Sequence, residues 1–231
     1  MLNPEIIPTD TEHNFVHKFY NKNYDNFSDT RKNIWPCVQN YIDKQSPNQN
    51  IFEIGCGNGK NMLYAMNNGH RITGIDLCLK FVNICKKSGL NNTHLDSCLR
   101  QSFIDEQFDC VLSIAVFHHL STEEHRIKAL ENMINVMKTG GSGFLTVWAF
   151  EQPSNTKKKF KIGDNMVKWN RPYNDENNVR KYEVFDRYYY VYTEQMFIDY
   201  LTLEEVYQFM KTGDGFETFE WRGKIYETED L

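Results

Sequence analysis

Three glycines at alternating positions lie between two acidic residues, and this spacing suits the binding of a nucleoside. The residues are Glu53, Gly55, Gly57, Gly59 and Asp76. Glycine has no Cβ, so the backbone can turn sharply and approach a ligand closely. An acid about 20 residues beyond such a turn meets ribose hydroxyls in nucleotide-binding folds, and Asp76 follows Gly59 by seventeen positions. The spacing predicts a nucleoside-cofactor site, whereas a plain tight turn would explain the glycines alone.

Four further residues lie where neighbouring strands are expected to end. Asp96 and Ser97 follow a short run at about Asn92–Leu95, and Ile114 and Ala115 close a longer apolar run. We expect Asp96 and Ser97 to lie beside the adenine edge of the nucleoside, with an ordinary loop acid as the alternative. Ile114 and Ala115 are expected to line the cofactor, although packing alone would explain them equally well.

A second group of residues could recognise an anion. Arg187 is followed by Tyr188 and Tyr189, and the planar fork of arginine suits a carboxylate or a phosphate. His118 and His119 stand just before an expected helix cap. At most one of the two histidines is expected to face the site. A metal role is disfavoured, because no carboxylate or cysteine completes a ligand set.

The stretch from Ser154 to Pro172 holds six basic residues and one acid. A solvated loop is the usual meaning of such a run, but the aromatic residues within it favour contact with RNA phosphates and bases. The candidate RNA-binding residues are Lys157, Lys158, Lys159, Lys168, Trp169 and Arg171, together with Tyr188 and Tyr189 beside Arg187.

The periodicity of apolar residues places these candidates on alternating strands and helices. Strands are expected at Ile51–Ile54, Arg71–Ile75, Asn92–Leu95, Phe108–Ile114 and Ser142–Phe150, and helices at Lys60–Asn67, at Leu79–Lys87 and from Ser121 or Thr122 to Met137. Lys138–Gly141 is expected to cap the last of these helices. The alternation predicts an α/β fold, a mainly parallel sheet with helices on both faces.

The flanking regions complete a single domain over residues 1–231. An N-terminal helical cap at residues 1–45 is expected to hold one helix from Glu12 to about Tyr24 and another from the capping residues near Phe27 to Asp43. Residues 151–185 are polar and lysine-rich, and we interpret them as an insertion or a mobile cover of the site. The remaining expected elements are a strand at Asp186–Thr193, a helix at Glu194–Leu201 and strands at about Val206–Lys211 and Phe216–Ile225.

Composition limits the class of protein. A hydrophobic content of 40% and a charged content of 25% are ordinary for a soluble globular protein. No apolar run approaches the roughly 20 residues that span a bilayer, and the N-terminus lacks the regions of a secretory signal, so a cytoplasmic location is expected. The net charge of −5 argues against a strongly basic nucleic-acid binder. The six cysteines lack zinc spacing and are interpreted as reduced packing residues.

These residues together resemble a known family. The order of Glu53, the three glycines, Asp76 and Asp96 is similar to that of class I S-adenosylmethionine-dependent methyltransferases. More narrowly, the chain resembles the eukaryotic tRNA carboxymethyluridine methyltransferases in Val16–Tyr20, Phe27–Arg31, Trp35–Pro36, Ser113–Glu124, Val147–Gln152 and Arg187–Tyr189. It departs from that pattern at Asn170 and Tyr190, where the family has histidine.

The resemblance implies a Rossmann-like α/β fold with a seven-stranded, mostly parallel sheet, and S-adenosylmethionine as the cofactor. It implies methyl esterification of 5-carboxymethyluridine at the wobble position of the tRNA anticodon loop. It also implies a small zinc-containing activator subunit, which would extend the sheet along the strand near Asn91–Leu95. By this resemblance Tyr20 and Arg31 close over the cofactor, and the candidate catalytic residues are Arg187, Arg31 and His118, with no metal of the chain's own.

The chemistry of such an acceptor is simple, because a carboxylate has a pKa near 4 and is already the nucleophile at neutral pH. Two other functions are consistent with the same residues. The acceptor carboxylate could belong to a small molecule or a protein, or the chain could be a catalytically silent tRNA-binding scaffold with this fold.

Overall fold

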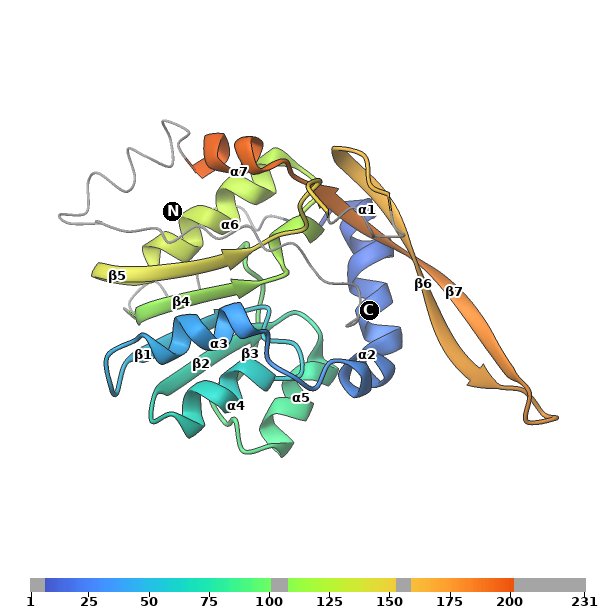
Figure 1. Cartoon of the computed structure of the whole chain (residues 1–231), viewed down its shortest axis with the longest axis horizontal. Helices are drawn as coiled ribbons and strands as arrows, with labels where there is room; N and C mark the ends of the chain where they lie inside the picture. Colours follow the sequence, from blue (N-terminus) through green and yellow to red (C-terminus); the bar gives the residue numbers. More distant parts are fainter. Residues whose placement is uncertain (1–6, 101–107, 153–158, 202–231) are drawn as a thin grey trace.

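The computed structural model describes residues 7–100, 108–152 and 159–201. Five strands form one parallel sheet in the order β3–β2–β1–β4–β5 (Figure 1). They are β1 (Asn50–Ile54), β2 (Arg71–Asp76), β3 (Thr93–Leu95), β4 (Phe108–Ile114) and β5 (Met137–Thr146). The helical elements are α1 (Asp10–Glu12), the π-helical turn η1 (His13–His17), α2 (Lys18–Thr30), α3 (Pro36–Asp43), α4 (Lys60–Asn67), α5 (Leu79–Lys87), the 3₁₀ turn η2 (Phe117–His119), α6 (Glu123–Asn135) and α7 (Glu194–Leu201).

Helices bury both faces of this sheet. On one face Ile42 of α3 and Met62 of α4 pack into the same apolar cluster as Ile51 of β1. On the other, Leu130 of α6 and Phe197 of α7 pack with strand residues such as Phe52 and Val111. Strands that are covered on both faces have continuous apolar sequences, and such runs led to the prediction of an α/β fold with helices on both faces. The structure confirms that prediction.

The parallel pairing brings the ends of the strands to one edge of the sheet. Ile54 at the end of β1 lies beside Ile75 of β2 and Ser113 of β4, and Asp76 at the end of β2 lies beside Leu95 of β3. Ligands of open α/β sheets bind outside these carboxyl ends, so the acidic candidates meet where a site is expected.

The N-terminal helices differ from the sequence prediction. The chain is helical from Asp10 to Thr30 through α1, η1 and α2. A non-helical linker follows, and α3 begins at Pro36. A proline disfavours the helical conformation in the residue before it, and Trp35 is extended, with ψ 141°. The predicted helix from Phe27 to Asp43 therefore ends where expected but starts too early, because Pro36 begins α3 at its first position.

The predicted helix cap at Lys138–Gly141 is also wrong, because α6 ends at Asn135 and these residues belong to β5. Met137 pairs with Phe108 and Ser142 pairs with Cys110, with an irregularity of register between them. Gly140 has φ +76°. A glycine with positive φ occurs in β-bulges as well as in helix caps. The glycines at this point of the sequence therefore could not distinguish a helix cap from an irregular strand.

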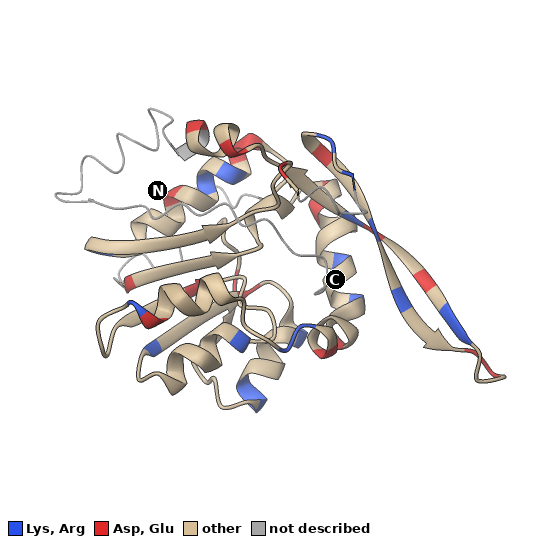
Figure 2. Ribbon diagram, viewed as in Figure 1, with Lys and Arg blue, Asp and Glu red and all other residues tan. Residues whose placement is uncertain are grey.

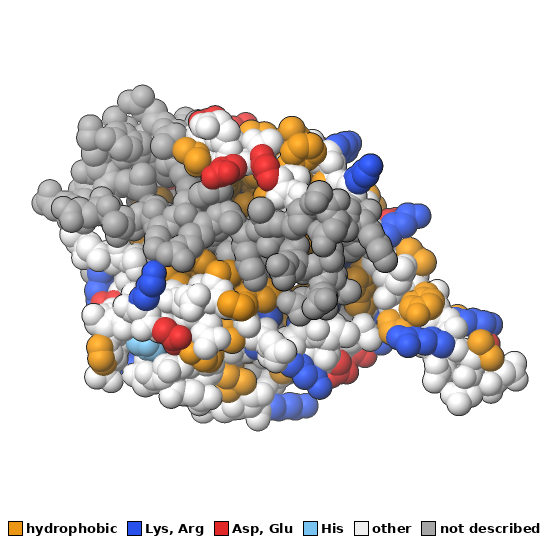
Figure 3. Space-filling view, viewed as in Figure 1, with side chains coloured by type: hydrophobic (Ala, Val, Ile, Leu, Met, Phe, Trp, Pro, Cys, Tyr) orange, Lys and Arg blue, Asp and Glu red, His pale blue; other side chains and the backbone are white. Residues whose placement is uncertain are grey.

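The predicted insertion at residues 151–185 is more regular than predicted in its described part from residue 159 onward. Strands β6 (Gly163–Asn174) and β7 (Arg180–Val191) form an antiparallel ribbon, and the predicted strand at Asp186–Thr193 is largely the end of β7. The ribbon projects from the body beside α2 (Figure 1), and its free end carries apolar and basic side chains together (Figure 3).

Contacts with α2 hold the base of the ribbon. The rings of Trp169 and Phe19 meet at 5.1 Å between centroids, Arg171 pairs with Asp25 at 2.9 Å and Lys22 pairs with Glu183 at 2.7 Å. A two-stranded ribbon is marginal in water by itself. These partners lie far away in the sequence, so local patterns could not indicate an ordered ribbon in place of a mobile cover.

The last two predicted strands, at Val206–Lys211 and Phe216–Ile225, lie outside the described residues. Within the described ranges the expected seven-stranded sheet is a five-stranded parallel one. None of the described helices is long and apolar enough to cross a membrane.

Gly59 offers a test of how α4 and α5 pack. It precedes α4 with φ +76°, and a Cβ there would lie 2.6 Å from Leu90 Cδ1 and 2.8 Å from Cys85 Sγ. Gly57 also has positive φ, +54°, but a Cβ would meet nothing within 4 Å. We expect Gly59→Ala to lower the free energy of unfolding by about 3 kcal/mol, from backbone strain and overpacking, and Gly57→Ala by about 1 kcal/mol, from strain alone. Urea unfolding of both variants checks this, and equal losses would show that the packing at Gly59 is not tight.

Candidate active site

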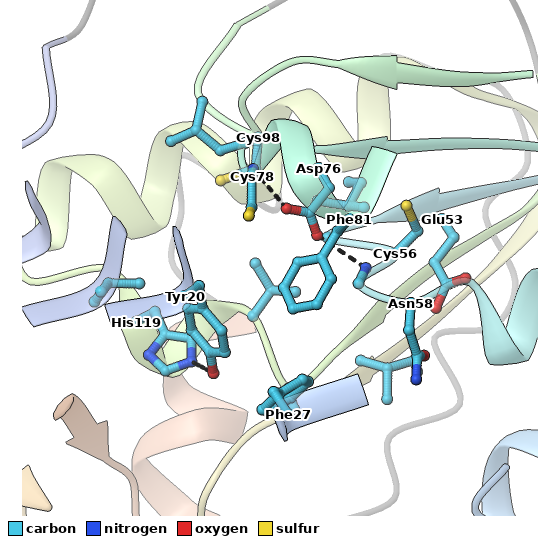
Figure 4. Close-up of a pocket in the computed structure, with 18 of the residues that line it drawn as sticks. Tyr20, Phe27, Glu53, Cys56, Asn58, Asp76, Cys78, Phe81, Cys98 and His119 are labelled. Carbon is cyan, nitrogen blue, oxygen red and sulfur yellow. Dashed lines mark hydrogen bonds between the residues drawn. The ribbon is translucent and has the colours of Figure 1, made fainter. Parts of the chain in front are cut away.

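The glycine loop between β1 and α4 is built around the carboxylate of Asp76. Gly57 N donates to Asp76 Oδ2 and Cys78 N donates to Asp76 Oδ1, each at 2.8 Å (Figure 4). Burial raises the pKa of Asp76 to about 6 and outweighs these two bonds, which lower it. A carboxylate oxygen accepts more than one hydrogen bond, so the fixed Asp76 can still receive the hydroxyls of a ligand.

Glu53 lies at the bottom of the same loop and is 1% exposed. Its Oε1 accepts from Asn61 Nδ2 at 2.7 Å, whereas Oε2 has no partner among the described residues. Burial raises the pKa of Glu53 to about 8. A buried polar atom without a partner is costly, so Oε2 is a ready acceptor for an ammonium or amide group.

A single cavity of about 280 Å³ joins these acids to the N-terminal helices. Thirteen of the predicted site residues line it, namely Tyr20, Arg31, Glu53, Gly55, Gly57, Asp76, Asp96, Ser97, Ile114, Ala115, His118, Arg187 and Tyr189. Ala115 has φ +60°, a strained conformation for alanine that is held by a bond from its N to Thr146 Oγ1 at 2.9 Å. Such strain is concentrated at functional sites. Gly59 does not line the cavity and acts in packing.

The sequence did not reveal Glu12, which closes one side of the cavity and is 2% exposed. Its Oε1 accepts from Ser121 N at 2.7 Å and lies 2.8 Å from His125 Nδ1, and its Oε2 accepts from Thr9 N at 3.1 Å. These bonds fasten the start of the N-terminal helix to the start of α6. Only the capping box at Thr9 and Glu12 could have indicated a role for this residue.

An aromatic wall was also missed. The ring of Tyr20 lies 5.2 Å from that of Phe27 and 6.2 Å from that of Phe81, centroid to centroid, and all three line the cavity (Figure 4). Trp148 lines it as well. The side chains come from α2, α5 and the segment after β5, and no shared spacing in the sequence links them.

Arg187 lies in this cavity with one edge of its guanidinium free. It is 2% exposed, and its Cζ lies 5.0 Å from the ring centroids of both Phe19 and Tyr189. Its Nε and Nη2 have no hydrogen-bond partner among the described residues. These two nitrogens form the edge that pairs with both oxygens of a carboxylate, so the geometry of this buried edge suits a planar anion.

A directed chain of hydrogen bonds fixes the neighbours of Arg187. Burial lowers the pKa of His119 to about 3, so its ring is neutral. Its Nδ1 lies 3.0 Å from the carbonyl oxygen of Tyr188, and because a carbonyl only accepts, Nδ1 carries the proton. Nε2 must then accept from the Tyr20 hydroxyl at 2.8 Å (Figure 4).

Tyr20 thereby connects the chain to Arg187. Burial raises the pKa of Tyr20, and the positive charge of Arg187 opposes this rise. The Tyr20 hydroxyl, whose proton is donated to His119, is therefore held near Arg187. His119 thus lines the cavity beside His118, and the prediction that at most one histidine faces the site is wrong.

His118 is 1% exposed. Burial lowers its pKa well below the usual value, and its Nδ1 has no partner among the described residues. The ring packs edge-on against Tyr189, with centroids 4.7 Å apart. A histidine held neutral in this way can exchange a hydrogen bond with a ligand but is not a cation at neutral pH.

The predicted RNA-binding residues do not form one surface. Lys157 and Lys158 lie outside the described residues, and Lys159 and Lys168 are exposed. Trp169 and Arg171 face α2, and the Tyr188 hydroxyl bonds Asp164 Oδ1 at 2.5 Å. Alternate residues of a strand point to opposite faces, so β6 separates Lys168 from Trp169 and Arg171. The described members of this group other than Tyr189 do not line the cavity.

Comparison with known proteins identifies similar chains. Residues 52–145 match the family model described as "Methyltransferase domain". The chain is 34% identical over 170 residues to mouse "Probable tRNA methyltransferase 9B", covering 74% of this chain and 36% of that protein, so it spans about a third of that relative's length. It is 35% identical over 149 residues to the tRNA (carboxymethyluridine(34)-5-O)-methyltransferase of Schizosaccharomyces pombe, covering 64% of this chain and 63% of that one.

A relative from Encephalitozoon cuniculi, whose name describes it only as a methyltransferase, is 34% identical over 168 residues. That match covers 71% of this chain and 78% of the relative. Among solved structures, the sugar N-methyltransferase KedS8 from Streptoalloteichus superposes with a TM-score of 0.58 at 12% identity, over 78% of this chain and 82% of that one. This last likeness concerns the fold alone.

The raised pKa of Glu53 predicts a pH-dependent stability. The folded state binds this proton more tightly than the unfolded state, whose carboxyl has a pKa near 4.3. The wild-type free energy of unfolding therefore falls as pH rises from about 5 to 8, by up to about 1.4 kcal/mol per pH unit. Glu53→Gln lacks this titration, so its stability relative to wild type should increase over that range and level off above pH 8.

Urea unfolding at several pH values between about 5 and 9 measures this difference. Glu176→Gln, in the exposed turn between β6 and β7, is the matched control and should follow the wild type at every pH. A gap between Glu53→Gln and wild type that does not change with pH would mean that Glu53 is ionised in the folded protein.

Proposed function

The chain belongs to the class I methyltransferase family, and from this membership we propose that it methylates tRNA. The proposed acceptor is the carboxylate of 5-carboxymethyluridine at the wobble position of the anticodon loop, and the proposed methyl donor is S-adenosylmethionine. The relatives named for this reaction support the substrate. One observation carries the proposal, namely the buried and unpaired edge of Arg187 in the cavity that also holds Glu53 and Asp76.

The residues of the cavity fit a nucleoside-containing sulfonium donor. Asp76 is fixed by two backbone N–H groups and would accept from the ribose hydroxyls. Glu53 Oε2, buried without a partner, would accept from the amino end. Asp96, whose Oδ1 accepts from Ser97 N at 2.8 Å, would lie at the adenine edge with Ser97, and Ile114 and Ala115 would line the donor. When bound, S-adenosylmethionine supplies an electrophilic methyl group.

Arg187 would hold the acceptor carboxylate. Placing an arginine in an apolar cavity without a partner is unfavourable, and a carboxylate ligand relieves this cost with two parallel, charge-assisted hydrogen bonds. The rings of Phe19 and Tyr189 hold the guanidinium in place, and the Tyr20–His119–Tyr188 chain fixes the Tyr20 hydroxyl near it before substrate arrives. Preorganised groups of this kind avoid reorganisation during the reaction.

The acceptor needs no general base, because its carboxylate is ionised at neutral pH. His118 stays neutral and can only exchange a hydrogen bond with the acceptor, while Tyr189 and Trp148 exclude water from it. Arg31 lies nearer the opening, partly exposed, with its guanidinium 4.5 Å from the Phe27 ring centroid. The chain's contribution is therefore orientation and desolvation of the nucleophile.

Methyl transfer to tRNA purified from cells that lack the corresponding methyltransferase tests the proposal. Nucleoside mass spectrometry should show 5-carboxymethyluridine converted to its methyl ester in the presence of donor. Transfer to small or protein carboxylates but not to tRNA would favour the alternative acceptor. Absence of donor binding in calorimetry, with the activator subunit present, would instead favour a silent scaffold.

Arg187→Gln should reduce methyl transfer at least about 100-fold, because two charge-assisted hydrogen bonds contribute roughly 3 kcal/mol. The same change removes an unpaired buried charge, so the free energy of unfolding should rise and not fall. Arg180→Gln, on the exposed part of the same strand, is the control and should leave transfer unchanged. Full activity in Arg187→Gln would remove Arg187 from the reaction.

We further propose that a small zinc-containing activator docks on β3. This strand is at one edge of the described sheet. Asn92 O and Asp96 N bond to β2, so by alternation Thr93 and Leu95 turn their backbone groups outward. The Leu95 side chain is 52% exposed. An edge strand with unpaired backbone groups and an apolar side chain suits extension of the sheet by a partner strand.

Leu95→Pro tests this docking site, because proline removes the outward N–H and leaves the bonds to β2 in place. The variant should fold but should not co-purify with the co-expressed activator, which the wild-type chain should retain. The control is Leu79→Ser, at an exposed position of α5, and this variant should keep the activator. Retention of the activator by Leu95→Pro would exclude β3 as its site.

A further inference from the structure

The segment between α2 and α3, Arg31–Trp35, forms part of the cavity wall. Lys60, the first residue of α4, lines the cavity beside it, with its Nζ 5.2 Å from the Trp35 ring centroid. Asn58 of the glycine loop donates to the carbonyl oxygen of Arg31 at 3.1 Å. The linker is therefore attached to the donor-binding loop. Lys32 is exposed although it lines the cavity, so the linker lies at the opening.

Three basic side chains line this opening. Arg31, Lys32 and Lys60 all contribute a cation to it, and the linker is drawn in blue for its basic residues in Figure 2. The acids that line the cavity are Glu12, Glu53, Asp76 and Asp96. Three of these are at least nine-tenths buried, and Asp76 is held by the glycine loop.

We propose that Arg31, Lys32 and Lys60 bind the phosphate backbone of the nucleotides that flank the target uridine. This inference rests on the proposed function, in which the acceptor base enters the cavity from an RNA loop. A base that reaches Arg187 brings its flanking phosphates to the opening, where these three cations lie. Phosphate contacts position a nucleic acid without reading its sequence, and unstacked loop bases are the usual targets of RNA-modifying sites.

The ribbon is less suited to this role than its sequence indicated. The guanidinium of Arg171 is paired with Asp25, and Trp169 is packed between Phe19 and Phe185. Lys181 is paired with Asp175 at 2.8 Å. Two of the ribbon's cations are thus paired within the chain, and only the opening places cations on the wall of the cavity that holds Arg187 among the described residues outside the ribbon.

Fluorescence anisotropy of an unmodified anticodon stem-loop with the full chain tests this proposal, and the readout does not require methyl transfer. Lys32→Gln combined with Lys60→Gln should weaken binding roughly tenfold, and the slope of log Kobs against log salt concentration should flatten by about 1.4, or about 0.7 for each lost contact with single-stranded RNA. Lys32→Arg should bind like the wild type.

The control variant is Lys86→Gln combined with Lys87→Gln, which makes the same change of charge on the exposed end of α5, away from the cavity. Its salt slope should match the wild type. If the wild type binds the RNA and the two double variants have equal salt slopes, the phosphate-binding role of these cations is overturned, while the proposed function is not. A loss of donor affinity without a loss of RNA affinity would assign these cations to the donor carboxylate instead. A wild-type chain that binds no RNA would contradict the proposed function as well.

Discussion

The site depends on a positive charge that is buried without an ion pair to any of the described residues. Arg187 is 2% exposed and keeps two nitrogens free of hydrogen bonds to the described residues. A fold maintains such an arrangement only if the surrounding structure supports it and a ligand benefits from it. The support comes from Phe19, Tyr189 and the hydrogen bonds through Tyr20 and His119. The ribbon, α2 and η2 are therefore parts of one receptor for an anion.

The two ends of the cavity use burial in opposite ways. At the sheet edge, burial raises the pKa of Glu53 and Asp76, so a cationic donor that binds there would stabilise their ionised forms. At the far end, burial keeps both histidines neutral and leaves Arg187 as the charged group. A cationic donor and an anionic acceptor thus each meet a region of opposite character. This separation explains how one apolar cavity would bring two charged molecules together.

The sheet and its acids were predictable because strands buried on both faces are continuous apolar runs, and parallel strands bring their ends to one edge. Glu53, Asp76 and Asp96 followed from that rule. The break at Arg31–Trp35 was missed because Pro36 was counted inside a helix that it begins. The ribbon, Glu12 and His119 were missed because distant partners, Asp25, Ser121 and Tyr20, hold them in place. Sequence patterns report local structure and burial, and the acceptor end is built from long-range contacts.

The central claim is that the free edge of Arg187 selects a carboxylate. The most direct measurement compares the affinity of the chain for two anticodon stem-loops that differ in one group. One carries 5-carboxymethyluridine and the other carries the neutral isostere 5-carbamoylmethyluridine. A buried arginine that pairs with both carboxylate oxygens predicts tighter binding of the acid by roughly 100-fold. Equal affinities would contradict the claim, because the cavity would then not distinguish the charge that Arg187 is placed to receive.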